Sequence, residues 1–311
     1  MKSLVQKYLF IVILIHPGFI IISCKQDKKV DEPPCVECSD FDHFAIDYDP
    51  AWSHDGKFIT YYHEDKELAK AGLYIISPDG TGNKLWHQGV SVNSPSWSPD
   101  GGWITFSHGV QIWKKKIDGD SLQQLTTVGR NFYPSWSPDG KWIAYDSDVD
   151  SPTGLKFIWK MHHDGSNKTR IAYDTVNGET RMPYWAKNDV ISHVRYVNSG
   201  SHHPEVFIMD SNGDHVRRLT NDSHHDRYPR LSSNNQIVFS RQSSGESPKI
   251  WIMSAVDGDS KTNLGPTTEV CEWSPDGNRI VYTNAIKSDG RLWIMHADGS
   301  NKKQLTFINQ F

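Results

Sequence analysis

Residues 134–145 read Pro-Ser-Trp-Ser-Pro-Asp-Gly-Lys-Trp-Ile-Ala-Tyr, a pattern that predicts a β-hairpin. The residues up to Trp136 form a short strand, and those from Trp142 to Tyr145 form an alternating return strand. The turn between them has specific chemistry: Pro138 presets φ at its second position, Asp139 tolerates the third, and Gly140 accepts the left-handed conformation. We therefore expect a tight turn at Ser-Pro-Asp-Gly.

The same hairpin recurs along the chain. Close copies lie at 50–56, 95–101 and 271–277, and worn copies at 183–189 and 229–235. The tryptophan position of the copies is occupied by Trp52, Trp97, Trp136, Trp185, Leu231 and Trp273. These residues are 39 to 49 positions apart, a period typical of four-stranded propeller blades. The chain is therefore predicted to contain six repeats, with tryptophans buried between blades.

Each repeat carries a second hairpin after the first. A third strand such as Ile-Trp-Ile-Met at 250–253 or Leu-Trp-Ile-Met at 292–295 leads into an Asp-Gly or Asn-Gly pair, the strongest short-range hairpin signal. A fourth strand then ends in Leu-Thr or in a degenerate form of this pair. The predicted fold class is all-β, a six-bladed β-propeller of four-stranded antiparallel blades.

The combination of Trp-Ser-Pro-Asp-Gly, Ile-Trp-Ile-Met, Asp-Gly-Ser-Asn and Gln-Leu-Thr resembles the repeat of TolB-type propellers, a WD-repeat-like family of the bacterial cell envelope. The resemblance covers residues 47–306. It implies the propeller fold and an envelope location. The α/β domain that precedes the propeller in TolB is expected to be missing here, because few residues separate Cys24 from the first repeat.

The N-terminus has the anatomy of a secretory signal. Lys2 and Lys7 precede an apolar run that ends in Ser23-Cys24, and a Pro-Gly break makes the run too short for a membrane span. A small residue directly before a cysteine resembles a bacterial lipobox, so Cys24 is predicted to be lipidated and to anchor the chain to a bilayer. The alternative is ordinary signal-peptide cleavage without lipidation. The predicted boundaries are 1–23 for the signal peptide, 24–40 for a polar tether and 41–311 for the propeller.

Cys35 and Cys38 lie in the tether. A redox Cys-x-x-Cys would sit at a helix start within an α/β unit, and the sequence predicts no such unit. A local disulfide or a pair of free thiols is favoured instead.

Composition and missing motifs narrow the function. The net charge is −4 with no basic clusters, which argues against a nucleic-acid partner. The sequence has neither a Gly-x-Ser-x-Gly elbow nor a phosphate-binding glycine loop. We therefore expect a monomeric, non-enzymatic protein without a cofactor.

One repeat position marks a candidate binding site. The loops between second and third strands and the blade connectors should share one face, where the innermost strands begin. The residues two places before each motif proline, or its replacement Cys271, then ring the channel mouth: Tyr48, Asn93, Phe132, Arg181, Arg227 and Glu269. Paired arginines would suit a carboxylate. Alternatively, these side chains merely pack or are solvated.

Fifteen histidines suggest a second possibility. His193, one of the pair His202 and His203, and one of the pair His224 and His225 could converge with Asp226 near the same mouth, with His193, His202 and His224 as the representative set. They could hold a metal, as in propeller lyases that act on uronic-acid oligosaccharides; solvated loop histidines are the competing interpretation. The leading hypothesis is a lipid-anchored envelope scaffold that binds a protein or peptide. The alternative is an enzyme or binder for acidic oligosaccharide.

Overall fold

The computed structural model describes residues 14–15, 18–19, 45–119, 121–172, 178–196, 203–286 and 289–311. The chain divides into two units, Met1–Asp42 and His43–Phe311. In the first unit, β1 (Leu14–Ile15) pairs antiparallel with β2 (Gly18–Phe19). Within the described ranges, no helix has the length and apolar character that crossing a bilayer requires.

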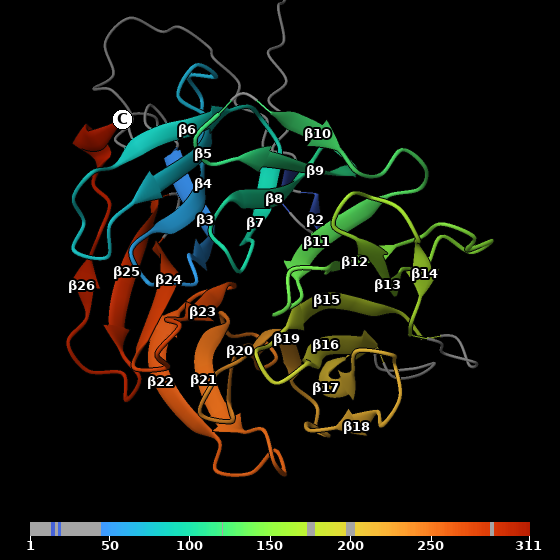
Figure 1. The fold of residues 1–311 in the computed structure, drawn as a ribbon. Helices are drawn as coiled ribbons and strands as arrows, with labels where there is room; N and C mark the ends of the chain where they lie inside the picture. Colours follow the sequence, from blue (N-terminus) through green and yellow to red (C-terminus); the bar gives the residue numbers. More distant parts are fainter. Residues whose placement is uncertain are drawn as a thin grey trace, which may run out of the picture. The chain divides into compact units, whose positions relative to one another are not determined.

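The second unit is a six-bladed β-propeller, which confirms the predicted fold class (Figure 1). Blades 1 and 2 consist of β3 (Ala45–Trp52), β4 (Ile59–Asp65), β5 (Gly72–Ile76) and β6 (Lys84–Gln88), then β7 (Val92–Trp97), β8 (Trp103–His108), β9 (Gln111–Lys116) and β10 (Leu122–Gln124). Blades 3 and 4 consist of β11 (Asn131–Trp136), β12 (Trp142–Ser147), β13 (Phe157–His162) and β14 (Thr169–Arg170), then β15 (Thr180–Trp185), β16 (Val190–Tyr196), β17 (Pro204–Asp210) and β18 (Arg217–Arg218). Blades 5 and 6 consist of β19 (His225–Leu231), β20 (Gln236–Gln242), β21 (Lys249–Ser254) and β22 (Thr262–Thr267), then β23 (Cys271–Trp273), β24 (Arg279–Ile286), β25 (Asp289–His296) and β26 (Lys303–Gln304). A short 3-10 helix, η1 (Ile308–Gln310), follows.

The motif serine and aspartate hold the first turn of the blade. In blade 3, Ser137 Oγ donates to Asp139 Oδ1 (2.7 Å) and accepts the backbone N–H of Trp142 (2.9 Å). Gly140 has a φ of 70°, in the left-handed region that favours glycine. Equivalent serine contacts recur in blades 1, 2 and 6. These motif residues therefore build the turn.

The motif tryptophans fill the junctions between blades. Trp136 packs against Ile112 and Leu125 of blade 2. All six aligned residues are at most 6% exposed. The repeat register deduced from the sequence is therefore confirmed.

The Leu-Thr signature also has a structural role. The hydroxyls of Thr126, Thr220 and Thr306 accept the backbone N–H at or near the start of the third strand in their blades, at 2.8, 2.9 and 3.0 Å. These hydrogen bonds offset the free-energy cost of burying the hydroxyls. The Asn-Gly turn of blade 4 sits on the preceding blade so closely that a Cβ at Gly213 would lie 1.8 Å from the Ile171 carbonyl oxygen.

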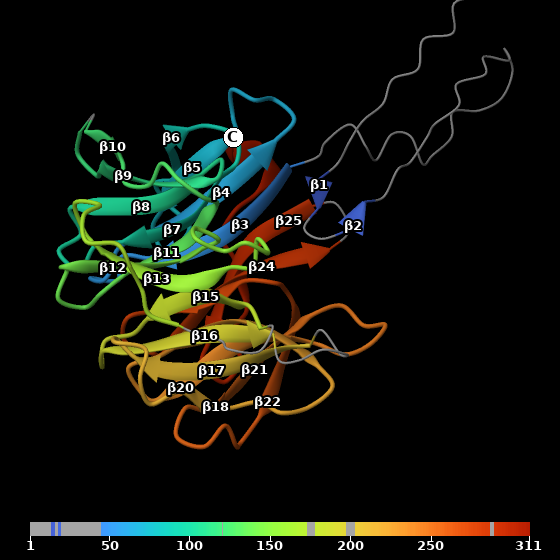
Figure 2. The same cartoon turned by 90° about the vertical axis from the view of Figure 1, so that its right-hand side faces the viewer.

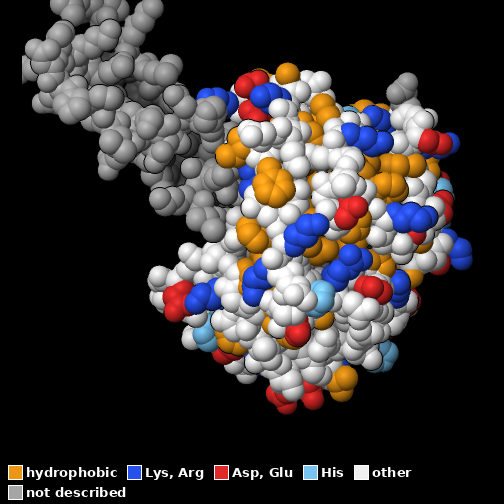
Figure 3. Space-filling view, turned by 90° about the vertical axis from the view of Figure 1, so that its left-hand side faces the viewer, with side chains coloured by type: hydrophobic (Ala, Val, Ile, Leu, Met, Phe, Trp, Pro, Cys, Tyr) orange, Lys and Arg blue, Asp and Glu red, His pale blue; other side chains and the backbone are white. Residues whose placement is uncertain are grey.

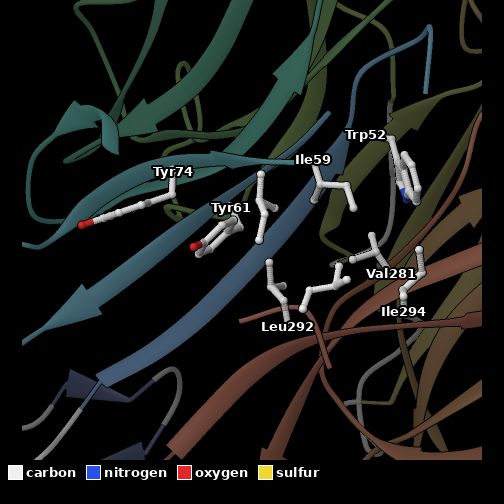
Figure 4. Packing of buried hydrophobic residues seen from close by; sticks show 9 residues of the cluster. Trp52, Ile59, Tyr61, Tyr74, Val281, Leu292 and Ile294 are labelled. Carbon is white, nitrogen blue, oxygen red and sulfur yellow. The ribbon is translucent and has the colours of Figure 1, made fainter. Parts of the chain in front are cut away.

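Side chains close the ring, because every blade is one continuous segment and no strand is shared. Blades 1 and 6 lie side by side in both ribbon views (Figures 1 and 2). Between them Trp52, Ile59 and Tyr61 meet Val281, Leu292 and Ile294 (Figure 4).

Asp47 is the polar centre of this junction and is fully buried. Its carboxylate contacts His63 Nδ1 at 2.6 Å and accepts the Thr306 hydroxyl, while its backbone carbonyl accepts Thr283 Oγ1 at 2.8 Å. One residue therefore joins the first blade to β24 and to the segment that follows β26 in the last blade.

Candidate functional site

The channel at the centre of the ring is surrounded by β3, β7, β11, β15, β19 and β23. The antiparallel order places the starts of these strands on one face, here called the variable face, and the Ser-Pro-Asp-Gly turns on the other, here called the turn face. On the side of the propeller drawn in Figure 3, basic, acidic and hydrophobic side chains are interspersed. Because charge does not mark a site on that side, the candidate site is sought at the channel.

The six predicted mouth residues share one structural position. Glu269 is exposed and the other five are half-buried. In the first five blades this residue directly precedes a β-bulge, as at Phe132 in β11 and Arg227 in β19. The next residue in those blades has a positive φ between 48° and 56°. We call this set of six the rim.

Arg181 is held by acids of its own molecule. Its Nε lies 3.4 Å from Asp146 Oδ2 and 3.6 Å from Glu179 Oε1. Asp146 is fully buried, and desolvation raises its pKa to about 6 although the Arg181 charge opposes the rise. The charge of Arg181 is thus largely balanced within the protein.

Arg227 is in a different environment. Its Nη2 lies 3.5 Å from His225 Nδ1, and the His225 ring contacts the His203 ring edge-on at 4.7 Å. Arg227 Nε and His203 Nδ1 are buried atoms without a hydrogen-bond partner. Burial, followed by the charges of Arg227 and His203, lowers the pKa of His225. Glu269 of the rim also interacts with the Arg227 charge, which opposes the rise that burial causes in the Glu269 pKa. Arg227 Nε nevertheless remains a donor that no protein atom accepts.

The three histidines proposed as metal ligands lie in different surroundings. His193 is buried beside Phe207, and desolvation lowers its pKa to about 4. His224 pairs with Asp222 at 2.7 Å, and His202 lies outside the described residues. Among the residues that are described, no three His, Cys, Asp or Glu side chains come together as a metal site would need.

Of the histidines considered from the sequence, His203 and His225 are in ring contact. They are the second members of the two pairs from which the sequence left one ligand each open. Adjacent strand residues point to opposite sides, so the sequence pattern did not decide which member of each pair faces the other.

Two tyrosines cross the channel below the rim. Tyr133 of blade 3 and Tyr228 of blade 5 are 95 residues apart, yet their hydroxyls lie 3.4 Å from each other and their rings 6.0 Å. Burial raises the pKa of Tyr133 to about 12. The pair narrows the channel at its variable-face end.

The cavity of the channel is lined by other residues than the rim. The cavity and the open space at its mouth together measure about 620 Å³, and no rim residue lines the cavity. Its walls include the residues directly before each aligned tryptophan or leucine: Ala51, Ser96, Ser135, Tyr184, Arg230 and Glu272. The sequence analysis missed this position. Its signal was present, because a small residue in the first three blades gives way to a large polar one in the last three.

Of the cysteines, only Cys271 lies within the described residues. It is buried, and burial raises the pKa of its thiol to about 12. Cys24, Cys35 and Cys38 lie outside, so lipidation and a disulfide stay predictions.

Fold and channel together define a six-bladed β-propeller whose polar channel is narrowed at the variable-face end by Tyr133 and Tyr228. Residues 41–189 match the family PD40, the TolB beta propeller domain, and the chain is a TolB-like propeller. TolB from Acinetobacter baumannii is similar in structure, with a TM-score of 0.65 and 22% identity over 83% of this chain and 62% of that one. The present chain thus spans less than two thirds of that relative.

Two further solved structures share the fold. A putative TolB from Agrobacterium tumefaciens has a TM-score of 0.64 and 20% identity over 75% of this chain and 87% of that one. An oligogalacturonate lyase in complex with manganese has a TM-score of 0.58 and 9% identity over 85% and 78%. No match was found among curated proteins.

Proposed function

We propose that this chain is a non-enzymatic, lipid-anchored scaffold of the bacterial cell envelope, and that its rim binds a protein or peptide segment bearing carboxylates. The observation that carries the proposal is the unpartnered, buried Nε of Arg227 on a rim that also contains the half-buried aromatic residues Tyr48 and Phe132. Arginine and aromatic side chains dominate the energetics of protein interfaces.

The variable-face end of the channel favours a partner that docks over the mouth rather than one whose chain passes through the channel. Tyr133 and Tyr228 meet beneath the rim, so a segment that docks there would contact these two tyrosines instead of entering the channel. Arg227 would supply charge-assisted hydrogen bonds to a carboxylate. Arg181 would contribute less, because Asp146 and Glu179 already accept its charge.

Rim substitutions test this assignment. Replacing Arg227 by Gln is expected to weaken capture of envelope partners roughly tenfold or more, since a hydrogen bond to a charged group contributes about 1.5–3 kcal/mol. Arg181→Gln is the matched control on the neighbouring blade and should cost clearly less. The measurement is a pull-down from envelope extract, followed by affinity titration of the captured protein. Undiminished capture by Arg227→Gln would move the site away from the rim.

A second candidate is a metal-dependent enzyme or binder for uronic-acid oligosaccharide. The contact between His203 and His225 favours it, together with the shared fold of the manganese-bound lyase. Chelation separates the two candidates: a peptide should still bind after EDTA treatment, whereas a metal-dependent lyase should lose turnover of oligogalacturonate.

The anchor and the location have their own test. The TolB likeness supports an envelope protein, and the Ser23-Cys24 junction supports acylation of Cys24. Cys24→Ala should abolish lipid labelling and release the protein from the membrane fraction. Unchanged membrane association of this variant would contradict the anchor.

A further inference from the structure

The channel opens on the turn face, where a second cavity adjoins it. The two cavities share Trp52, His54, Tyr184, Trp185 and Glu272 as lining residues. At the other end, Tyr133 and Tyr228 meet across the channel. The lumen is therefore a pocket entered from the turn face.

The repeat departs from its consensus around this opening. Blades 2, 3 and 6 have a proline at the second position of the first turn, which is Pro138 in blade 3. His54 occupies this position in blade 1, Lys187 in blade 4 and Ser233 in blade 5. Blade 5 also has Leu231 in place of tryptophan, and this smaller side chain borders the cavity. Losing a turn proline or a packed tryptophan costs stability. That all these departures line one cavity indicates a role other than folding.

The charges at the opening favour an anion. Arg230 packs its guanidinium over the Tyr184 ring at 5.1 Å, and exposed Lys187 reaches across blade 5 to the Pro275 carbonyl at 3.2 Å. Glu272 is the one carboxyl residue that lines the second cavity, whereas Asp49 lines the channel nearer the rim. Glu272 is 9% exposed and accepts the backbone N–H of Trp52 at 3.3 Å. His54 Nδ1 is buried without a partner.

We propose that this turn-face pocket binds the carboxylate of a small organic acid, held by Arg230 and Lys187 and by a hydrogen bond from protonated Glu272. A small acid suits a pocket that is narrowed at its far end. An ammonium ligand would be repelled by these two cations, whereas they would attract a carboxylate, to which Glu272 can add a hydrogen bond.

The pH dependence follows from Glu272. Desolvation raises its pKa to about 7, and Arg230 opposes the rise. Below that pH the carboxyl is neutral and can donate; above it, binding requires proton uptake, so affinity should fall up to about tenfold per pH unit. Of the other titratable groups that face it, burial lowers the pKa of His54 and raises that of Tyr184, so neither changes charge between about pH 7 and 8.5.

Calorimetric titration of the full chain with succinate tests the pocket. We expect saturable binding at pH 6.5 that weakens at least tenfold by pH 8.5. Arg230→Gln should weaken binding tenfold or more, and Lys187→Gln, at an exposed site where folding is not at risk, several-fold. Glu272→Gln should keep a neutral donor and so remove the pH dependence.

Arg181→Gln, at the variable face, is the control and should bind succinate like wild type. No saturable binding, pH-independent binding by wild type, or unchanged binding by both Arg230→Gln and Lys187→Gln would overturn the proposal. The outcome is separate from the proposed scaffold function, because capture of envelope partners at the rim does not depend on Lys187.

Discussion

Replacing Trp136 by Ala should lower the free energy of unfolding by about 3–5 kcal/mol. The indole is 5% exposed and packs against Ile112 and Leu125 of the preceding blade and Ile143 of its own. Alanine would leave a cavity at a junction whose walls are strands and cannot collapse freely. Denaturant unfolding of the variant and the wild type measures the difference.

Trp86→Ala is the matched control for this prediction. Trp86 is half-buried on the outer strand β6, where its indole N–H donates to the Ile117 carbonyl at 3.2 Å. Its removal should cost clearly less than that of Trp136, because solvent fills the space. Equal stability of Trp136→Ala and wild type would mean that the repeat position does not carry the inter-blade core.

Replacing Asp47 by Ala should cost about 3–5 kcal/mol, the range found when one partner of a buried salt bridge is removed. His63, also fully buried, would lose the acceptor at its Nδ1, and the Thr306 hydroxyl would lose its partner in blade 1. Because no strand is shared between the first and last blades, this junction has no backbone ladder to compensate. Hydrogen exchange should report faster opening of β3 and β25 than of blade 3.

Asp298→Ala provides the control for charge removal. Asp298 lies in an exposed turn of blade 6 and accepts the backbone N–H of Ser300 at 2.9 Å. Water can replace that contact, so a much smaller loss is expected. If Asp47→Ala unfolds like Asp298→Ala, the Asp47 carboxylate does not contribute to closing the ring.

Local chemistry made the fold predictable. Pro138, Asp139 and Gly140 specify one turn type wherever the motif occurs, and Trp136 marks the buried register of its strand. Both signals depend on neighbours within a few residues. With six copies, the repeat is recognisable even though two copies are degenerate. The blade count and the strand order therefore followed from repetition.

The candidate site was predictable only in part. The repeat position placed Arg181 and Arg227 together on the rim, because symmetry acts on every blade alike. It did not separate them: Asp146 balances Arg181, whereas Arg227 has the unpartnered Nε. Asp146 lies 35 residues before Arg181 and meets it across a blade boundary, a contact that hairpin chemistry does not encode.

The sequence by itself determined the blades, because each is a run of hairpins whose turns and alternating strands are encoded locally. Tertiary structure alone decided how the ring closes through Asp47, that Tyr133 meets Tyr228, and that Glu272 is buried beside Arg230 with a raised pKa. These features depend on distances between blades far apart in the chain. Such distances, and the desolvation that shifts a pKa, exist only once the ring has formed.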